Sequence, residues 1–263
     1  MSSKTLILIY LLVLESNSED FFSKNSWDSR IIGGRTAFLG QFPYQASLQR
    51  TRNSVTKHVC GGSVYNAKWI ITAGHCIAYF NTTTESRIVV GSVDLEIINP
   101  TFYHVKKFII HPKFDKILKT NDIALVQTQN EIIFSVNVKP IPINLNYEKE
   151  NMEAVTSGWG RVTIQGGRTN VLQYLNVTVM SNENCRKAHA ISKRSKFIYD
   201  NVICTQNERN KKGTCNGDSG GPLVINGTLI GIVSWGVRCA IGLPDVFTRI
   251  SEHVSWIQAT VRE

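Results

Sequence analysis

The sequence predicts an all-β fold that ends in one α-helix. Apolar and polar residues alternate in Tyr44–Gln49 with the period of two that is typical of a half-buried strand. Two further strand candidates, Pro222–Ile225 and Thr228–Trp235, flank Asn226-Gly227, a pair that favours a tight type I′ turn. Only the last stretch shows helical spacing, in four apolar residues that recur every three or four positions: Ile250, Val254, Ile257 and Val261.

More strand candidates are distributed along the chain, and one segment interrupts them. The candidates are Arg87–Val90, His104–Ile110, Asp122–Val126, Leu172–Met180 and Asn201–Thr205. In Asn137–Ile143, Pro140 and Pro142 cannot donate the hydrogen bonds of a sheet. We expect this segment to cross between two halves of similar length.

Composition excludes several classes of protein. A chain of 263 residues with 42% hydrophobic and 19% charged residues is neither a disordered tail nor a collagen-like repeat. The net charge of +9 raises the question of nucleic-acid binding. However, the two basic clusters lie in no nucleic-acid motif, so we expect solvated loops and no nucleic-acid partner. These clusters are Lys193, Arg194 and Lys196, and Arg209, Lys211 and Lys212.

The N-terminal segment is typical of an exported protein. Lys4 precedes an apolar run, Leu6–Leu14, which is too short to span a membrane but suits a signal peptide. We expect residues 1–18 to be this signal, with cleavage near Ser18, and no membrane anchor elsewhere. A secreted protein meets an oxidising environment, so we interpret the six cysteines as three disulfides. No Cys-x-x-Cys pair indicates structural zinc, and spacing alone leaves the disulfide pairing open.

Three short motifs offer the parts of a nucleophilic site. Ser219 lies among glycines in Gly217–Pro222, which permit close backbone approach. A serine hydroxyl needs a general base, which a carboxylate orients. His75, in Thr72–Cys76, offers the base, and Asp122 precedes an apolar strand. Each residue alone has a structural explanation, but together they match the order of a Ser-His-Asp triad.

With these motifs, the chain from Ile31 onward resembles the trypsin/chymotrypsin family of serine endopeptidases. Four more segments match the family pattern: Ile31–Gly34, Cys60–Gly62, Ser157–Gly160 and Ser234–Gly236. The resemblance implies two six-stranded antiparallel Greek-key β-barrels, at 31–142 and 143–263, with a C-terminal helix. It further implies a monomer without cofactor or metal that acts on protein substrates and meets serpin-type or other protease inhibitors.

The resemblance also assigns roles. Ser219 is expected to attack the substrate carbonyl, His75 to carry the proton and Asp122 to orient His75. The N–H groups of Gly217 and Ser219 are expected to form the oxyanion hole. The implied disulfides are Cys60–Cys76, Cys185–Cys204 and Cys215–Cys239.

Arg30-Ile31 resembles the activation bond of the family, which implies that residues 19–30 are a propeptide cut off by another protease. The freed ammonium of Ile31 is then expected to pair with Asp218. His58 matches a family histidine that engages this aspartate before activation, although a half-buried polar residue is an equal alternative. No cysteine lies between Ser18 and Ile31, so we expect the propeptide to be released.

The specificity pocket departs from the trypsin pattern. Gly213, followed by Thr214, stands where trypsins carry the aspartate that binds Arg or Lys. Gly236, after Ser234 and Trp235, leaves one wall open, and Asp245 enters from the opposite wall. This combination resembles the broad-specificity collagenolytic serine proteases of crustaceans and related arthropod enzymes. If Arg238 neutralises Asp245, we expect a chymotrypsin-like or mixed preference; if Asp245 is free, Arg and Lys are cleaved as well.

Two other functions remain open from the sequence. One is a catalytically silent homologue that acts as a secreted binding protein, although all three triad residues are present. The other is an added affinity for a heparin-like polyanion. Ser92–Glu96 lacks the acidic residue of calcium-binding relatives, so no calcium site is expected. Glycosylation sequons lie at Asn81, Asn176 and Asn226.

Overall fold

The computed structural model describes residues 31–78, 80, 82–143, 150–163, 167–206, 212–237 and 239–262. The expected signal peptide and propeptide, with Arg30, therefore lie outside the described residues. So do Asn81, Arg209, Lys211 and Arg238.

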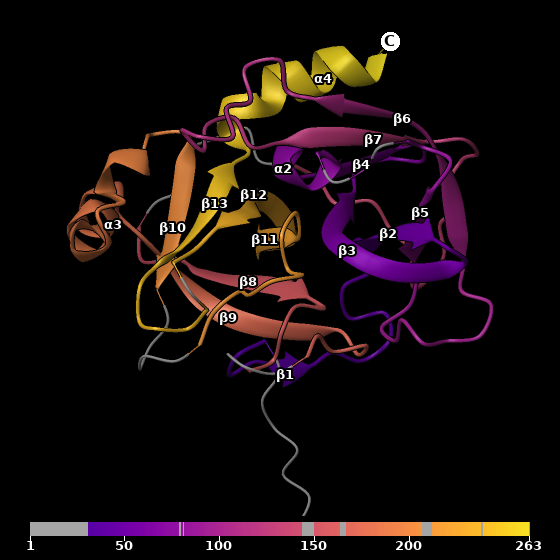
Figure 1. Cartoon of the computed structure of the whole chain (residues 1–263), viewed down its shortest axis with the longest axis horizontal. Coiled ribbons are helices and arrows are strands. Elements are labelled where there is room, and N and C mark those ends of the chain that lie inside the picture. Colours follow the sequence, from indigo (N-terminus) through magenta and orange to yellow (C-terminus); the bar gives the residue numbers. More distant parts are fainter. Residues whose placement is uncertain are drawn as a thin grey trace, which may run out of the picture.

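The first half of the chain forms a closed antiparallel barrel. Its strands are β2 (Gln45–Arg52), β3 (Val55–Val64), β4 (Trp69–Thr72), β5 (Ser86–Val90), β6 (Phe102–Ile110) and β7 (Ala124–Thr128). They pair in the order β2-β3-β4-β7-β6-β5, and a short helix, α2 (Gly74–Ile77), follows β4. Figure 1 shows this barrel beside a second one.

The second half repeats the architecture. Its strands are β8 (Glu153–Gly158), β9 (Gln173–Met180), β10 (Val202–Gln206), β11 (Pro222–Ile225), β12 (Thr228–Trp235) and β13 (Asp245–Arg249). The order β9-β10-β13-β12-β11-β8 closes because β8 also pairs with β9. The expected fold of two six-stranded barrels is confirmed.

Each end of the described chain packs against the barrel formed by the other half of the sequence. The short strand β1 (Arg35–Thr36) pairs with β9 of the second barrel. At the other end, η3 (Ser251–His253) leads into α4 (Val254–Arg262), the expected terminal helix. Figure 1 shows α4 lying over the strands β6 and β7 of the first barrel. Ile257 of α4 is buried in the hydrophobic core of this barrel. Each barrel is therefore tied to the opposite half of the sequence.

The proline-containing segment joins the barrels as expected. The Ile141 N–H donates to the carbonyl of Val64 in the first barrel at 2.8 Å. The Leu229 N–H of the second barrel donates to the carbonyl of Pro142 at 2.8 Å. Because proline keeps its carbonyl acceptor, the segment bonds to both barrels without belonging to a regular strand.

The strand predictions are confirmed, with ends shifted by at most three residues. The hairpin turn is also confirmed, because Asn226 and Gly227 both have positive φ, at 47° and 74°, as a type I′ turn requires. The sequence missed β1, β3, β4, β8 and β13 as strands.

The expectation of a single helical stretch is wrong. A helix, α3 (Asn182–His189), follows β9, and the 3-10 turns η1 (Ala190–Ser192) and η2 (Ser195–Phe197) come after it. The Ser181 hydroxyl caps α3 by accepting the Asn184 N–H, and only Cys185 and His189 are buried. A cap and a disulfide hold this helix in place of a long apolar stripe, so apolar spacing does not reveal it.

Candidate active site

The loop that carries Ser219 is held directly against the first barrel. The Gly61 N–H of β3 donates to the carbonyl of Ser219 at 2.8 Å, and the Gly220 N–H donates to the carbonyl of Val233 at 2.9 Å. Gly220 has a φ of +78°, and a Cβ there would collide with the Thr72 hydroxyl. The glycines of the Ser219 motif therefore let the loop pack between the barrels.

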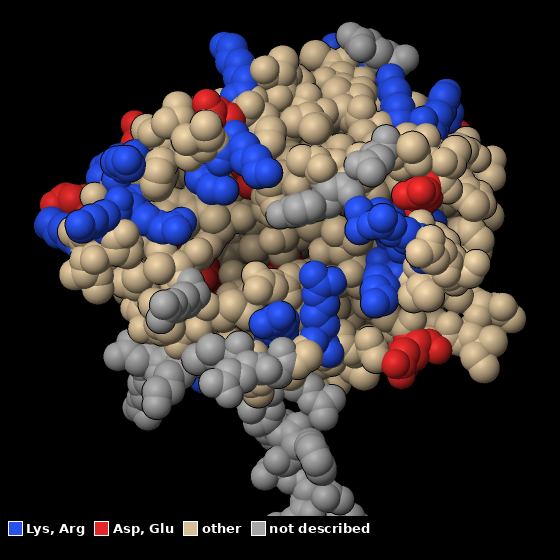
Figure 2. Space-filling model, in the orientation of Figure 1, with Lys and Arg blue, Asp and Glu red and all other residues tan. Residues whose placement is uncertain are grey.

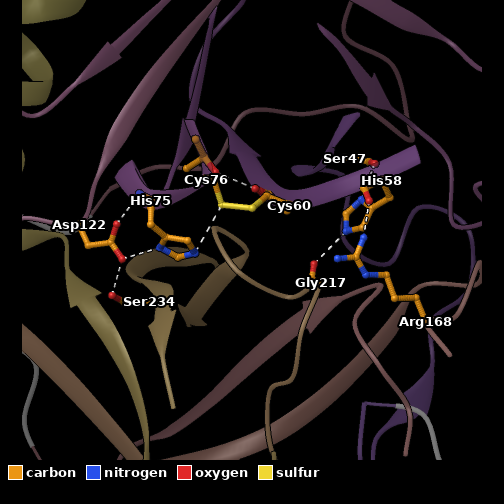
Figure 3. The surroundings of a disulfide bond; sticks show 11 residues. Ser47, His58, Cys60, His75, Cys76, Asp122, Arg168, Gly217 and Ser234 are labelled. Atoms are coloured by element: carbon orange, nitrogen blue, oxygen red, sulfur yellow. Dashed lines mark hydrogen bonds and ion pairs between the residues drawn. A yellow bond between two sulfur atoms is a disulfide. The ribbon is translucent and has the colours of Figure 1, made fainter. Parts of the chain in front are cut away.

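His75 is fixed from two sides. The disulfide Cys60–Cys76 joins α2 to β3 next to it. The His75 backbone N–H donates to Asp122 Oδ1 at 2.8 Å, and the ring Nδ1 lies 2.7 Å from Asp122 Oδ2. Figure 3 shows both contacts. Because a carboxylate only accepts, Nδ1 carries the proton and Nε2 is left as the basic nitrogen.

Asp122 stays a carboxylate although it is buried. Burial raises its pKa, but hydrogen bonds from His75 and from the Ser234 hydroxyl, 2.6 Å from Oδ2, outweigh burial and hold the pKa below its usual value. The Thr248 hydroxyl donates to the Asp122 carbonyl at 2.8 Å. A charged Asp122 can therefore orient His75 and stabilise its protonated form.

Ser219 and His75 line one cavity at the barrel junction, with a volume of about 330 Å³. Among the residues that the structure describes, no hydrogen bond joins Ser219 Oγ to His75; His75 Nε2 lies 3.8 Å from Cys76 Sγ instead. Contacts between a nucleophile and its base are often longer in the free enzyme and tighten when substrate binds.

The peptide of Gly217 is oriented by His58. His58 Nε2 lies 2.9 Å from the Gly217 carbonyl, which only accepts, so Nε2 donates. The Ser47 hydroxyl then donates to Nδ1 at 2.7 Å. Burial lowers the pKa of His58 to about 4, which keeps the ring neutral. Within the described chain, the N–H groups of Gly217 and Ser219 donate to no acceptor, so both are available to a ligand.

Arg168 completes this cluster, and sequence reasoning missed it. Its guanidinium donates to the His58 carbonyl, and its chain lies beside Gly217 (Figure 3). In the sequence it is one arginine in a polar loop, without a motif that marks it. His58 itself contacts Gly217 and Ser47, and not the Asp218 carboxylate that the resemblance suggested.

Asp218 is buried between two glycines. Its Oδ1 accepts the Gly160 N–H and its Oδ2 accepts the Cys215 N–H, each at 2.8 Å. A Cβ at Gly158 or Gly160 would collide with this carboxylate. Burial raises the pKa of Asp218 to about 6, while the two N–H groups and Arg168 act in the opposite direction.

Asp245 occupies the place that a side chain at residue 213 would need. A Cβ on Gly213 would lie 2.8 Å from Asp245 Oδ2, and one on Gly236 would lie 3.3 Å from Oδ1. The Thr214 N–H donates to Oδ2 at 2.7 Å. Burial raises the pKa of Asp245 to about 7. The structure thus brings Gly213, Thr214, Gly236 and Asp245 together.

Comparison with known proteins agrees with this geometry. The trypsin family model matches residues 31–257. The chain belongs to the trypsin family. Similar curated proteins include Trypsin-1 from Astacus astacus, 37% identical over 87% of this chain and 99% of its own length. Chymotrypsin-2 from Vespa crabro is 35% identical over 87% of this chain and 98% of its own, and Trypsin from Sus scrofa is 34% identical over 89% and 96%.

Membership of the trypsin family makes the chain a serine endopeptidase that acts on protein substrates. The three disulfides join the pairs that the resemblance implied: Cys60–Cys76, Cys185–Cys204 and Cys215–Cys239. Proteases of this family are mostly secreted. No helix among the described residues is long and apolar enough to cross a membrane.

Three cationic side chains also line the cavity of Ser219 and His75, and the sequence analysis did not place them there. Lys116 and Lys119 from the loop before Asp122, and Arg194 from the segment after η1, line it with Ser219 and His75. Arg194 was expected in a solvated loop, but it is half-buried at this cavity.

A metal site does not fit the described residues. The one group of candidate ligands is Cys60, His75 and Cys76, whose two sulfurs are joined in a disulfide and provide no thiolate. Of the described sequons, Asn176 on β9 and Asn226 at the hairpin tip are both exposed.

Proposed function

We propose that this serine endopeptidase is a secreted enzyme made as an inactive precursor, with a chymotrypsin-like or broad preference at P1, the residue whose carbonyl is attacked. Ser219, His75 and Asp122 are its catalytic triad. The observation that carries the assignment is the network of His75, Asp122 and Ser234 beside the cavity of Ser219, with hydrogen bonds of 2.7 and 2.6 Å.

The chemistry follows from these contacts. With Nδ1 protonated toward Asp122, His75 Nε2 takes the proton of Ser219 Oγ as the oxygen bonds to the substrate carbonyl carbon. The N–H groups of Gly217 and Ser219 receive the oxyanion. His75 then returns its proton to the leaving amine as the C–N bond breaks, and water, deprotonated by His75, cleaves the acyl-enzyme and restores Ser219.

A fluorophosphonate probe tests the triad. After cleavage at Arg30, the wild-type enzyme is expected to react through Ser219 and to lose peptidase activity. Ser219→Ala is expected to give no labelled protein, and Asp122→Asn to lower kcat about 10⁴-fold, because His75 would present the wrong tautomer. Labelling of the Ser219→Ala variant would reject the assignment.

The P1 preference follows from the base of the pocket. Gly213 and Gly236 carry no side chain into the pocket, and the space beside them is taken by the Asp245 carboxylate, which accepts the Thr214 N–H. Among the described residues, no cation forms an ion pair with Asp245. A carboxylate with a pKa of about 7 is partly neutral at physiological pH, which favours apolar P1 residues. Peptides with P1 Phe, Leu and Arg test this, and exclusive cleavage after Arg would reject it.

Two observations support the precursor. The side chain of Ile31 is fully buried in the core of the second barrel, so a new N-terminus at Ile31 would begin inside the protein. Asp218 is a buried carboxylate that a nearby ammonium would stabilise. Arg30→Gln is expected to prevent activity from appearing after trypsin treatment. N-terminal sequencing of the exported protein tests cleavage near Ser18, and full activity of Arg30→Gln would contradict the precursor.

A further inference from the structure

Lys and Arg side chains gather around the hollow between the two barrels. Figure 2 shows them on several sides of this hollow, on the face seen in Figure 1. Lys116, Lys119 and Arg194 line the same cavity as Ser219 and His75. We call these three residues the cleft cations. Because they line the cavity of Ser219, their charge acts on a substrate that is bound there.

Two cleft cations, Lys116 and Lys119, lie on a loop of the first barrel that is held by internal hydrogen bonds. Asp115 Oδ1 accepts the N–H groups of Ile117 and Leu118 at 2.7 and 2.8 Å. The backbones of Asp115 and Thr120 exchange two further hydrogen bonds, at 3.1 and 3.3 Å. Lys119 is held with a φ of +59°, which a residue with a Cβ rarely adopts. Such conformations persist where surrounding contacts fix them, so the loop presents its lysines in a defined place.

The third cleft cation comes from the second barrel. The Arg194 N–H donates to the His189 carbonyl at 3.2 Å, and the Arg194 carbonyl accepts the Phe197 N–H at 3.0 Å. The side chain of Arg194 is half-buried, as is that of Lys119, while Lys116 is exposed. A ligand in the cavity would therefore meet positive charge from both barrels.

No acidic group of the described chain neutralises the cleft cations. None of them forms an ion pair within the described residues. The nearest acid on the same loop, Asp115, uses Oδ1 to accept two backbone N–H groups. No Asp or Glu of the described chain lines the cavity; Asp122, behind it, is paired with His75, and Asp245 is buried against the Thr214 N–H. Unpaired charge in a concave site attracts ligands of opposite charge.

We propose that the cleft cations select substrates with an acidic side chain on the N-terminal side of the scissile bond, at one of the three residues that precede P1. The cavity that they line also contains Thr214, Cys215 and Gly236 of the P1 pocket, so the part of the peptide that enters with the P1 side chain passes beside them. This inference rests on the proposed function, because it requires attack by Ser219. It makes the enzyme selective for acidic peptides with a broad or apolar P1 residue.

A peptide series with constant P1 Phe tests the selection. Each of the three preceding positions carries Asp, Ala or Lys in turn, and kcat/KM is measured in low salt. An exposed charge pair changes affinity by up to about fivefold, and two pairs together by up to about 30-fold. We expect the best Asp peptide to exceed its Ala counterpart by about 5- to 30-fold and the Lys peptide to fall below it. Salt at about 0.5 M is expected to reduce the difference.

Charge-reversal variants test whether the cleft cations cause the preference for Asp peptides. Lys119→Glu and Arg194→Glu are each expected to remove the preference for Asp and to favour Lys peptides, whereas Lys119→Arg is expected to retain the preference. Lys106→Glu is the matched control, because Lys106 is exposed on β6 and does not line the cavity. An equal shift in Lys106→Glu and Lys119→Glu would overturn the proposal, since it would indicate net charge alone.

The Ala peptide distinguishes failure of the proposed peptidase function from failure of the proposed selection by the cleft cations. If the activated enzyme cleaves it and reacts with a fluorophosphonate, but Asp at all three positions gives no advantage, selection by the cleft cations is wrong and the proposed function stands. If neither the Ala peptide nor the probe reacts, the proposed function itself fails.

Discussion

Two buried carboxylates, Asp218 and Asp245, lie near the nucleophile in different surroundings. Asp218 accepts N–H groups from Gly160 and Cys215, and Arg168 adds a favourable positive charge. Asp245 accepts the Thr214 N–H, and the charge of Asp218 raises its pKa further. Since we propose Asp245 as the base of the P1 pocket, its protonation state would act directly on the substrate.

Asp245 is expected to make P1 preference depend on pH. Burial raises its pKa to about 7, so the carboxyl is neutral below this pH and charged above it. Cleavage after Arg relative to cleavage after Phe should therefore increase as pH rises from about 6 to 8. The ratio of kcat/KM values for P1 Arg and P1 Phe peptides measures this, because titration of His75 affects both peptides alike.

The control for this prediction is Asp245→Asn, which keeps an oxygen acceptor for the Thr214 N–H but carries no charge. The ratio is expected to be independent of pH in this variant. A pH dependence that persists in Asp245→Asn would assign the effect to another group.

Gly160 is expected to support the proposed oxyanion hole through Asp218. A methyl group at residue 160 would collide with both carboxylate oxygens of Asp218, which adjoins Gly217 and Ser219. Gly160→Ala is therefore expected to lower kcat/KM about 10²-fold or more, similar to the loss of one oxyanion donor. Gly167→Ala is the matched control, because a Cβ there meets nothing within 4 Å. Equal activity of the two variants would contradict this role.

At the scale of elements, α4 packs against the first barrel and links it to the end of the chain. Ile257 is fully buried in that barrel's core, although α4 follows the last strand of the second barrel. Ile257→Ala is expected to lower the free energy of unfolding by about 2–5 kcal/mol, through lost burial and the cavity left behind. Urea denaturation of the Ser219→Ala form, which avoids self-digestion, measures this. Ser255→Ala, at an exposed position of α4, should change stability by less than about 0.5 kcal/mol.

Sequence patterns predicted those elements whose burial is periodic. In β9, buried residues alternate with exposed or half-buried ones, and the strand was found. All five residues of β13 are buried, so no alternation marks it. In β3 the consecutive glycines Gly61 and Gly62 interrupt the apolar pattern that would indicate a strand. Glycine is needed at these two positions because a Cβ would collide with Gly221 or with Ile70. α3 was missed because its stability comes from a cap and a disulfide.

The candidate site divides in the same way. Ser219, His75 and Asp122 lie in short motifs that local sequence reveals. Arg168, Lys116 and Lys119 lie in loops without a motif, and only the packing of the two barrels brings them to the cavity or to Gly217. Long-range placement of this kind leaves no local pattern.

Over the whole molecule, the positive charge belongs to the proposed mature enzyme. Residues 1–30 contain Lys4, Lys24 and Arg30 against four acids, Glu15, Glu19, Asp20 and Asp28, a net charge of −1. Their removal would change the total from +9 to +10. Acidic substrates would thus be attracted to the molecule by its net charge and held at the nucleophile by the cleft cations.

Cleavage at Arg30 is expected to stabilise the molecule in a pH-dependent way. Folding raises the pKa of Asp218 from 3.8 to about 6 in the uncleaved chain. This acid therefore lowers the free energy of unfolding progressively as pH rises from about 4, and the decrease is complete above about pH 6. One pKa unit corresponds to about 1.4 kcal/mol, so the charged form costs about 3 kcal/mol. The ammonium of Ile31, paired with Asp218, would offset this loss.

The melting temperatures of Ser219→Ala before and after cleavage at Arg30 test this sign. Because about 1 kcal/mol shifts Tm by roughly 2–4 °C in a protein of this size, the gain on cleavage should reach about 5–10 °C at pH 7. It should shrink as pH falls from about 6 toward 4, because Asp218 of the folded uncleaved chain is then protonated and no longer carries a buried, unpaired charge. In Asp218→Asn, which retains an acceptor but never ionises, the gain should not vary with pH. An equal gain at pH 4 and pH 7 in Ser219→Ala would mean that Ile31 stabilises the cleaved protein by packing alone, without an ion pair to Asp218.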